Sequence, residues 1–172
     1  MAWPDGAWRR LSIEIGGGDP REVSEVWWLQ CGRRYADVRV SRCADAGRLP
    51  YSSTQAFAGR SSYDPATHTM EWVNRFDTED RAGALDLARL YPCEGNPRVM
   101  RENGDTYTEY WGRMDFGDEP GAVSESESCL RVQVGAYAIT LERVGLRTIG
   151  TFSTFDGSEW TARLSAVDAQ ID

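Results

Sequence analysis

Residues 26–40 read Val-Trp-Trp-Leu-Gln-Cys-Gly-Arg-Arg-Tyr-Ala-Asp-Val-Arg-Val, and their pattern is the clearest indication of the fold class. Residues 26–30 and 35–40 are rich in β-branched and aromatic side chains, and Gly32-Arg33-Arg34 lies between them. Two strand-forming runs separated by a short segment that contains glycine are typical of a β-hairpin. We therefore expect two antiparallel strands joined by a tight turn.

Short runs of alternating apolar and polar residues continue on both sides of this hairpin, separated by Gly, Pro, Asp and Asn clusters. This pattern predicts antiparallel sheet along most of the chain. Asn103-Gly104 is the strongest single turn signal. A helix is expected only over residues 52–58. Besides the two strands of the hairpin, the expected strands cover residues 11–15, 70–76, 85–87, 99–102, 106–113, 130–134, 137–143, 147–155 and 159–164.

About ten strands joined by tight turns can close on themselves and leave no unpaired edge. The sequence therefore predicts an all-β fold: a single antiparallel, up-and-down, lipocalin-like β-barrel of about 8–10 strands with one short helix, in one domain over residues 1–172. A β-sandwich is the alternative, although its Greek-key crossovers need longer connections. Residues 44–67 and 117–128 lack a clear strand pattern. We expect the first stretch to cover one end of the barrel and the second, which is acidic, to form a solvated loop.

Composition excludes several classes of function. The formal net charge of -8 and the isoelectric point near 4.7 argue against nucleic-acid and anionic-membrane partners, which need a basic surface. The chain has no lysine, so Schiff-base and phosphate-loop lysine chemistry is excluded. His68 is the only histidine, which rules out multi-histidine metal sites. We expect no metal and no cofactor.

The cysteines and the N-terminus bear on location. The four cysteines show no Cys-x-x-Cys spacing, and residues 1–10 contain no apolar core of a signal peptide. No apolar run approaches the roughly 20 residues that a membrane helix needs. The expectation is a soluble cytoplasmic protein with reduced thiols.

Charged and aromatic residues alternate on two of the expected strands. Asp37 and Arg39 share one side of their strand, and Glu109, Trp111 and Arg113 share one side of theirs. Only Thr, Tyr and Gly side chains lie behind Glu109, so we expect Glu109 and Trp111 to point into the barrel. The charged residues Asp37, Arg39, Glu109 and Arg113 would then form one buried network. The alternative is that they form solvated ion pairs on the outer surface of the barrel.

This network supplies the catalytic candidates. Glu109 is the acid or base, Arg39 or Arg113 would stabilise developing negative charge, and Asp37 completes the group. Burial beside Trp111 would raise the pKa of Glu109 and a nearby arginine would lower it. Seven tryptophans either fill the barrel or line a cavity in it. The candidate ligand-binding residues are Trp28, Phe57, Trp72, Arg75, Tyr107, Trp111 and Arg113.

Several short motifs occur in a fixed order. They are Trp-x-Gln at 28–30, Asp-x-Arg at 37–39, Phe-Ala-Gly at 57–59, Trp-x-x-Arg at 72–75 and Glu-x-Trp-x-Arg at 109–113. Over roughly residues 8–115 the chain thereby resembles a group of little-characterised bacterial and fungal proteins with a calycin-type, lipocalin-like barrel. The resemblance implies the fold, and several lipocalin-like barrels serve biosynthetic pathways.

Three functions fit these features. The first is a barrel that takes a hydrophobic or polycyclic small molecule into its interior and acts on it without a cofactor, as a cyclase, isomerase or dehydratase. The second is a carrier or sensor that binds the molecule unchanged. The third is an intracellular protein-interaction module whose barrel is filled. A homodimer is compatible with all three.

Overall fold

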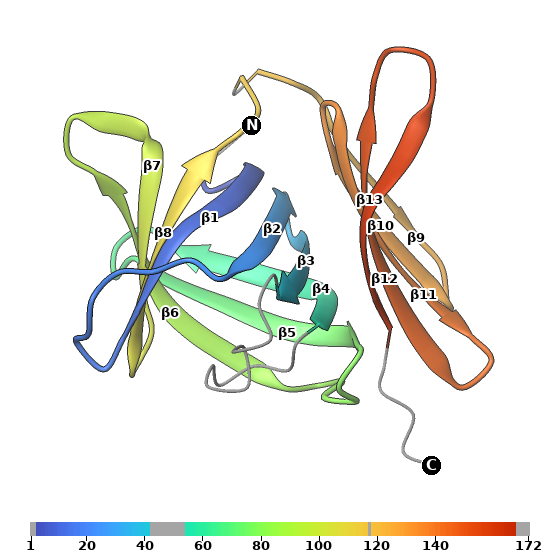
Figure 1. Ribbon diagram of the computed structural model, residues 1–172, viewed down its shortest axis with the longest axis horizontal. Coiled ribbons are helices and arrows are strands. Elements are labelled where there is room, and N and C mark those ends of the chain that lie inside the picture. The colour runs from blue at the N-terminus through green and yellow to red at the C-terminus, as the bar shows by residue number, and fades with distance from the viewer. Residues whose placement is uncertain (1–2, 42–53, 117, 168–172) are drawn as a thin grey trace.

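The computed structural model describes residues 3–41, 54–116 and 118–167, and within these ranges the fold is all-β (Figure 1). Eight strands form a closed antiparallel barrel in which each strand pairs with its neighbour in sequence and β1 closes against β8. The up-and-down order predicted from the hairpins is therefore confirmed. The barrel strands are β1 (Gly6–Ile15), β2 (Ser24–Cys31), β3 (Arg34–Ser41), β4 (Thr54–Asp64), β5 (Thr69–Asp77), β6 (Leu85–Cys93), β7 (Asn96–Asn103) and β8 (Tyr107–Arg113).

A second, five-stranded antiparallel sheet follows the barrel, so the prediction that all strands join one barrel was wrong. Figure 1 shows this sheet, in orange and red, standing beside β2, β3 and β4. Eight strands already close the barrel, and the later hairpins form a separate layer on its outer surface. The sheet runs in the order β13-β12-β11-β10-β9, from β9 (Gly121–Glu125), β10 (Cys129–Val134), β11 (Tyr137–Val144), β12 (Arg147–Phe155) and β13 (Trp160–Val167).

The helix expected over residues 52–58 is also wrong. Residues 52–53 lie outside the described ranges, and residues 54–58 form the first half of β4. The acidic stretch that was expected to be a loop contains β9, although all five side chains of this edge strand are exposed. The described residues contain no helix that is long and apolar enough to cross a lipid bilayer.

Two cores result from this arrangement, one on each side of the barrel wall. On β3, Tyr35 and Asp37 point into the barrel, while Ala36 and Val38 pack against the second sheet. The outer core joins these alanine and valine side chains to residues such as Leu141 of the second sheet. The alternation that the sequence shows at residues 35–40 thus separates an inner face with charged groups from an apolar outer face.

Glycine permits close approach at two points of the barrel. A Cβ atom on Gly59 would lie 2.0 Å from the carbonyl oxygen of Val73, where a β-bulge offsets β4 from β5. A Cβ atom on Gly150 of β12 would lie 2.2 Å from the Cβ of Ala56 on β4. The second sheet can therefore approach β4 this closely only because both facing residues are small.

A β-bulge in β1 reverses the expected orientation of its first residues. The pairing with β8 shifts between Arg10 and Ser12, which leaves Leu11 exposed and buries Arg10. In a regular strand Leu11 would lie on the same face as Ile13, which is buried. Because of the extra residue, Arg10 instead points into the barrel.

Candidate functional site

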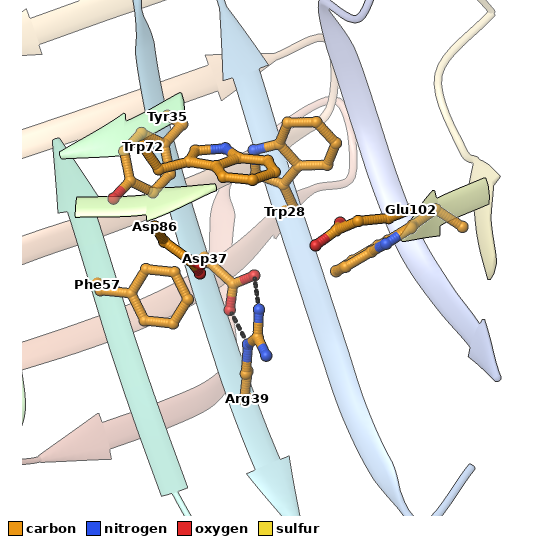
Figure 2. Close-up of a pocket in the computed structure, with 9 residues that line it drawn as sticks. Trp28, Tyr35, Asp37, Arg39, Phe57, Trp72, Asp86 and Glu102 are labelled. Carbon is orange, nitrogen blue, oxygen red and sulfur yellow. Dashed lines mark hydrogen bonds and ion pairs between the residues drawn. The ribbon is translucent and has the colours of Figure 1, made fainter. Parts of the chain in front are cut away.

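A small space inside the barrel, which we call the interior site, collects most of the candidate residues (Figure 2). Trp28 comes from β2, the Asp37 and Arg39 side chains from β3, Phe57 from β4 and Trp111 from β8. Alternation along each strand brings these side chains to the inner face. The full lining is Trp28, Tyr35, Asp37, Arg39, Phe57, Trp72, Asp86, Glu102 and Trp111.

The interior site is narrow and walled by aromatic rings. Trp28 lies edge-on to Trp72, with ring centroids 5.9 Å apart, and edge-on to Trp111 at 5.8 Å. The space that the described side chains leave measures about 20 Å³. This is room for about one water-sized group, whereas sites that enclose drug-sized ligands measure roughly 300–1,000 Å³. In this conformation the space is too small for a whole polycyclic molecule.

Two arginines and three carboxylates form a buried chain of ion pairs. Arg10 donates to Glu109 Oε1 at 2.6 Å and to the two carboxylate oxygens of Glu22 at 2.7 and 3.1 Å. Arg39 donates to both oxygens of Asp37 at 2.8 and 3.1 Å, as the dashed lines in Figure 2 show. Its Nη1 also lies 3.9 Å from Glu109 Oε1. Asp37, Arg39 and Glu109 are thus joined in one network.

Glu102 of β7 is a further acid at this site, which the sequence interpretation missed. It lies opposite Glu109 on the neighbouring strand and accepts a hydrogen bond from the Tyr107 hydroxyl at 2.9 Å. Burial, reinforced by the negative charge of Glu109, raises the pKa of Glu102 to about 8. At neutral pH Glu102 therefore carries a proton and can act as a hydrogen-bond donor.

The charges of the innermost groups balance once Glu102 is protonated. Burial raises the pKa of Asp37, but the charge and hydrogen bonds of Arg39 oppose this. The two guanidinium groups of Arg10 and Arg39 then face the two carboxylates of Asp37 and Glu109, with partly exposed Glu22 as a further partner. A balanced set of this kind makes burial of so many charges tolerable.

Trp28 Nε1 and Trp111 Nε1, on residues that line the interior site, and Glu109 Oε2 are buried polar atoms with no hydrogen-bond partner among the described residues. Each side chain is at most 2% exposed, so bulk water does not satisfy these atoms. Leaving buried donors and acceptors unpaired costs roughly 1–3 kcal/mol each. Two indole N–H donors of residues that line the site and one carboxylate oxygen of Glu109, which is joined to it through Arg39, are therefore unpaired in this conformation.

Two of the sequence candidates lie elsewhere. Arg75 is on the outer side of β5, where it pairs with Glu125 of the second sheet and donates to the backbone oxygen of Ser126 at 2.7 Å. Arg113 pairs with Asp115 at 2.9 Å and stacks over the Trp8 ring, away from the interior site. The position that the sequence interpretation gave to Arg113 in the network is occupied by Arg10.

The remaining candidates are at the site or next to it. Trp28, Phe57, Trp72 and Trp111 line it, and Tyr107 contacts it through Glu102. Among the described residues, no three His, Cys, Asp or Glu side chains are grouped so that they could hold a metal ion.

Fold and site together define an eight-stranded antiparallel barrel with a charged, aromatic-walled interior site, flanked by a second sheet. No protein-family model and no curated protein matches the sequence. The structure is similar to that of the uncharacterized protein YLR301w from Saccharomyces cerevisiae, with a TM-score of 0.67 and 14% sequence identity over 92% of this chain and 84% of that chain. At this identity the similarity concerns the fold alone.

Proposed function

We propose that the protein is a lipocalin-like barrel that binds a small molecule by admitting its hydroxyl or carbonyl group to the interior site. The observation that carries the proposal is the set of unpartnered atoms: Trp28 Nε1, Trp111 Nε1 and Glu109 Oε2. A hydroxyl group can accept from an indole N–H and donate to a carboxylate, so it matches both kinds of atom. A carbonyl oxygen would use the indole donors only.

The rest of the ligand would be apolar. Phe57 lines the site and is only partly buried, and the Arg39 guanidinium lies 5.0 Å from the centre of its ring. Trp72 provides a second aromatic surface at the same site. In many ligand pockets the hydrocarbon part of the ligand packs against aromatic rings, and a few polar groups bind its polar end.

Small alcohols test this proposal. Cyclohexanol and methylcyclohexane have similar shapes, but only the first can hydrogen-bond. In ¹H–¹⁵N spectra, cyclohexanol should shift the indole N–H signals of Trp28 and Trp111, and methylcyclohexane should leave them nearly unchanged. The signals are assigned with Trp→Phe variants. If neither compound shifts these two signals, or both shift them equally, the proposal fails.

A second candidate function is cofactor-independent proton transfer, as in an isomerase, cyclase or dehydratase. It is favoured by the position of Glu102, whose pKa burial raises, directly opposite Glu109 on the adjacent strand. Glu109 would take a proton from a carbon next to a bound carbonyl, and Glu102 would give its proton to the carbonyl oxygen. The charges of Arg39 and Arg10 would stabilise the enol-like transition state.

Cyclohexanone in D₂O distinguishes this activity from binding alone. A barrel that transfers protons should speed the exchange of the hydrogens next to the ketone, as followed by ¹H NMR, and Glu109→Gln should abolish the acceleration. The matched control is Glu94→Gln in an exposed turn. Binding without accelerated exchange would leave the protein a carrier or sensor and would remove the enzymatic candidate.

A further inference from the structure

A groove of about 690 Å³ opens at the other end of the barrel, next to the turn between β2 and β3. It lies between the N-terminal segment at Trp3 and the β4–β5 hairpin at Tyr63 and His68. Met70, which is buried in the inner core, forms part of its floor. We call it the turn-end groove. Its volume is within the range of sites that hold small ligands.

The side-chain amide of Gln30, which lines this groove, has one unpaired atom. Gln30 is 1% exposed, and its Nε2 donates to the Gly32 carbonyl oxygen at 2.6 Å and to Ser61 Oγ at 2.7 Å. Its Oε1 has no hydrogen-bond donor among the described residues. Exchanging the amide oxygen and nitrogen would bring two oxygens together at Gly32 and leave the nitrogen without an acceptor, so the assigned orientation holds. Oε1 is therefore an unpaired hydrogen-bond acceptor.

Aromatic rings form the open side of the groove. Trp3 and Tyr63 meet edge to face, with centroids 4.7 Å apart and planes at 72°. The Tyr63 hydroxyl is held by His68 Nδ1 at 3.1 Å, which fixes the position of its ring. Both rings are only partly buried, so a flat molecule can reach them from solvent.

The charges that border the groove cancel. Asp5 and Arg33 both line it, and they carry opposite signs. The Asp5 carboxylate is already engaged with the backbone N–H of Gly32 at 2.9 Å. A ligand of either charge would meet one like and one opposite group, so the groove favours a neutral molecule.

We propose that the turn-end groove binds a neutral, flat heteroaromatic molecule with an N–H group, which donates to Gln30 Oε1 while the ring packs against Trp3 and Tyr63. The ligand needs an N–H group because Gln30 Oε1 lacks a donor. It should be flat and apolar because Trp3 and Tyr63 present aromatic rings to the groove. This site is separate from the interior site and does not depend on the function proposed for it.

Indole and 1-methylindole test the proposal as a matched pair, because methylation removes the N–H and keeps the flat ring. In ¹H–¹⁵N titrations of the full chain, indole should shift the side-chain signals of Gln30 and Trp3, and 1-methylindole should bind at least about fivefold more weakly, as expected for loss of one hydrogen bond. Equal affinity for the two compounds, no shift up to the solubility limit of indole, or shifts confined to Trp28 and Trp111 would each overturn the proposal.

Variants supply a second readout. Gln30→Met keeps the length of the side chain and removes the acceptor, so the variant should bind the two compounds equally. Trp3→Ala should weaken both, whereas Trp160→Ala on β13, an exposed tryptophan outside the groove, should weaken neither. Circular dichroism checks that each variant is folded. If Gln30→Met retains the preference for indole, the amide is not the acceptor and the assignment is wrong.

Discussion

Glu102 and Glu109 lie directly opposite each other on β7 and β8, and both are buried inside the barrel. Two carboxylates this close, away from water, do not both ionise readily. Glu102 keeps the proton, because Arg10 pairs with Glu109 and not with Glu102. Because only Glu102 is protonated, it can donate a hydrogen bond, whereas the Glu109 carboxylate can only accept one.

The raised pKa of Glu102 makes stability depend on pH. The folded chain holds this proton until about pH 8, whereas the unfolded chain releases it near 4.5. The contribution of this proton to the free energy of unfolding is thus fully present below about pH 4.5 and is lost as the pH rises toward 8. Glu102→Gln removes it. Between pH 5 and 8 the wild type should lose roughly 3–4 kcal/mol more free energy of unfolding than the variant does.

Urea unfolding at pH 5, 6, 7 and 8 measures this difference. Glu94→Gln is the control, since this glutamate is exposed in the β6–β7 turn and its replacement should leave the pH dependence of the wild type in place. Parallel stability curves for the wild type and Glu102→Gln would contradict a protonated Glu102.

Arg10 and Glu109 should show strong energetic coupling. Glu109→Gln leaves the Arg10 guanidinium buried with only Glu22 as a charged partner, which should cost about 3 kcal/mol of unfolding free energy. Arg10→Met should cost a similar amount. The double variant should lose clearly less than the sum of the two single losses, because neither charge is then left unpaired. Chemical denaturation of the four proteins gives the coupling energy, and additive losses would rule out the pair as a unit.

Removing the indole N–H groups should weaken binding without unfolding the barrel. Trp28→Phe and Trp111→Phe keep an aromatic ring and delete one unpartnered donor each. Each should reduce the affinity for cyclohexanol by about fivefold, the loss expected for one hydrogen bond. Arg75→Gln is the control, because Arg75 lies outside the barrel. An affinity that Arg75→Gln lowers as much as the tryptophan variants do would place the site elsewhere.

The contact between the barrel and the second sheet should be sensitive to a single methyl group. Gly150→Ala places a Cβ atom 2.2 Å from the Cβ of Ala56, so one strand must move. Overpacking of this kind costs about 1–3 kcal/mol. Ala56→Gly should recover part of the loss in the double variant, although it is itself destabilising. Thermal unfolding tests both, and an unchanged Tm for Gly150→Ala would show that the two layers are not in close contact.

The same contact explains why β4 looked helical in the sequence. Ala56, Ala58 and Gln55 are good helix formers, and local propensity alone favours a helix there. The alanines are small because they pack against the second sheet, so tertiary packing overrides propensity. The second sheet itself had a signal in residues 26–29, which are apolar at every position. A strand that is apolar on both faces must be covered on both.

The inward orientation of Glu109 and Trp111 could be predicted because their neighbours on β8 are too polar to form a core. Glu102 could have been found by counting back from the Asn103-Gly104 turn, which places it opposite Glu109. Arg10 could not, because a β-bulge shifts the alternation by one residue and period-two reasoning then assigns the wrong face. The local sequence pattern thus predicts the hairpins and the face on which most side chains lie. The partners in the ion pairs depend on the register between strands, which the local pattern does not give.

A high-resolution crystal structure of the protein soaked with cyclohexanol tests the interior site most directly. We expect an oxygen atom in the cavity, about 2.7–3.2 Å from the Nε1 of Trp28 or Trp111 or from Glu109 Oε2. A dry cavity, or side chains that rotate to fill it and pair these atoms with one another, would overturn the proposed binding mode.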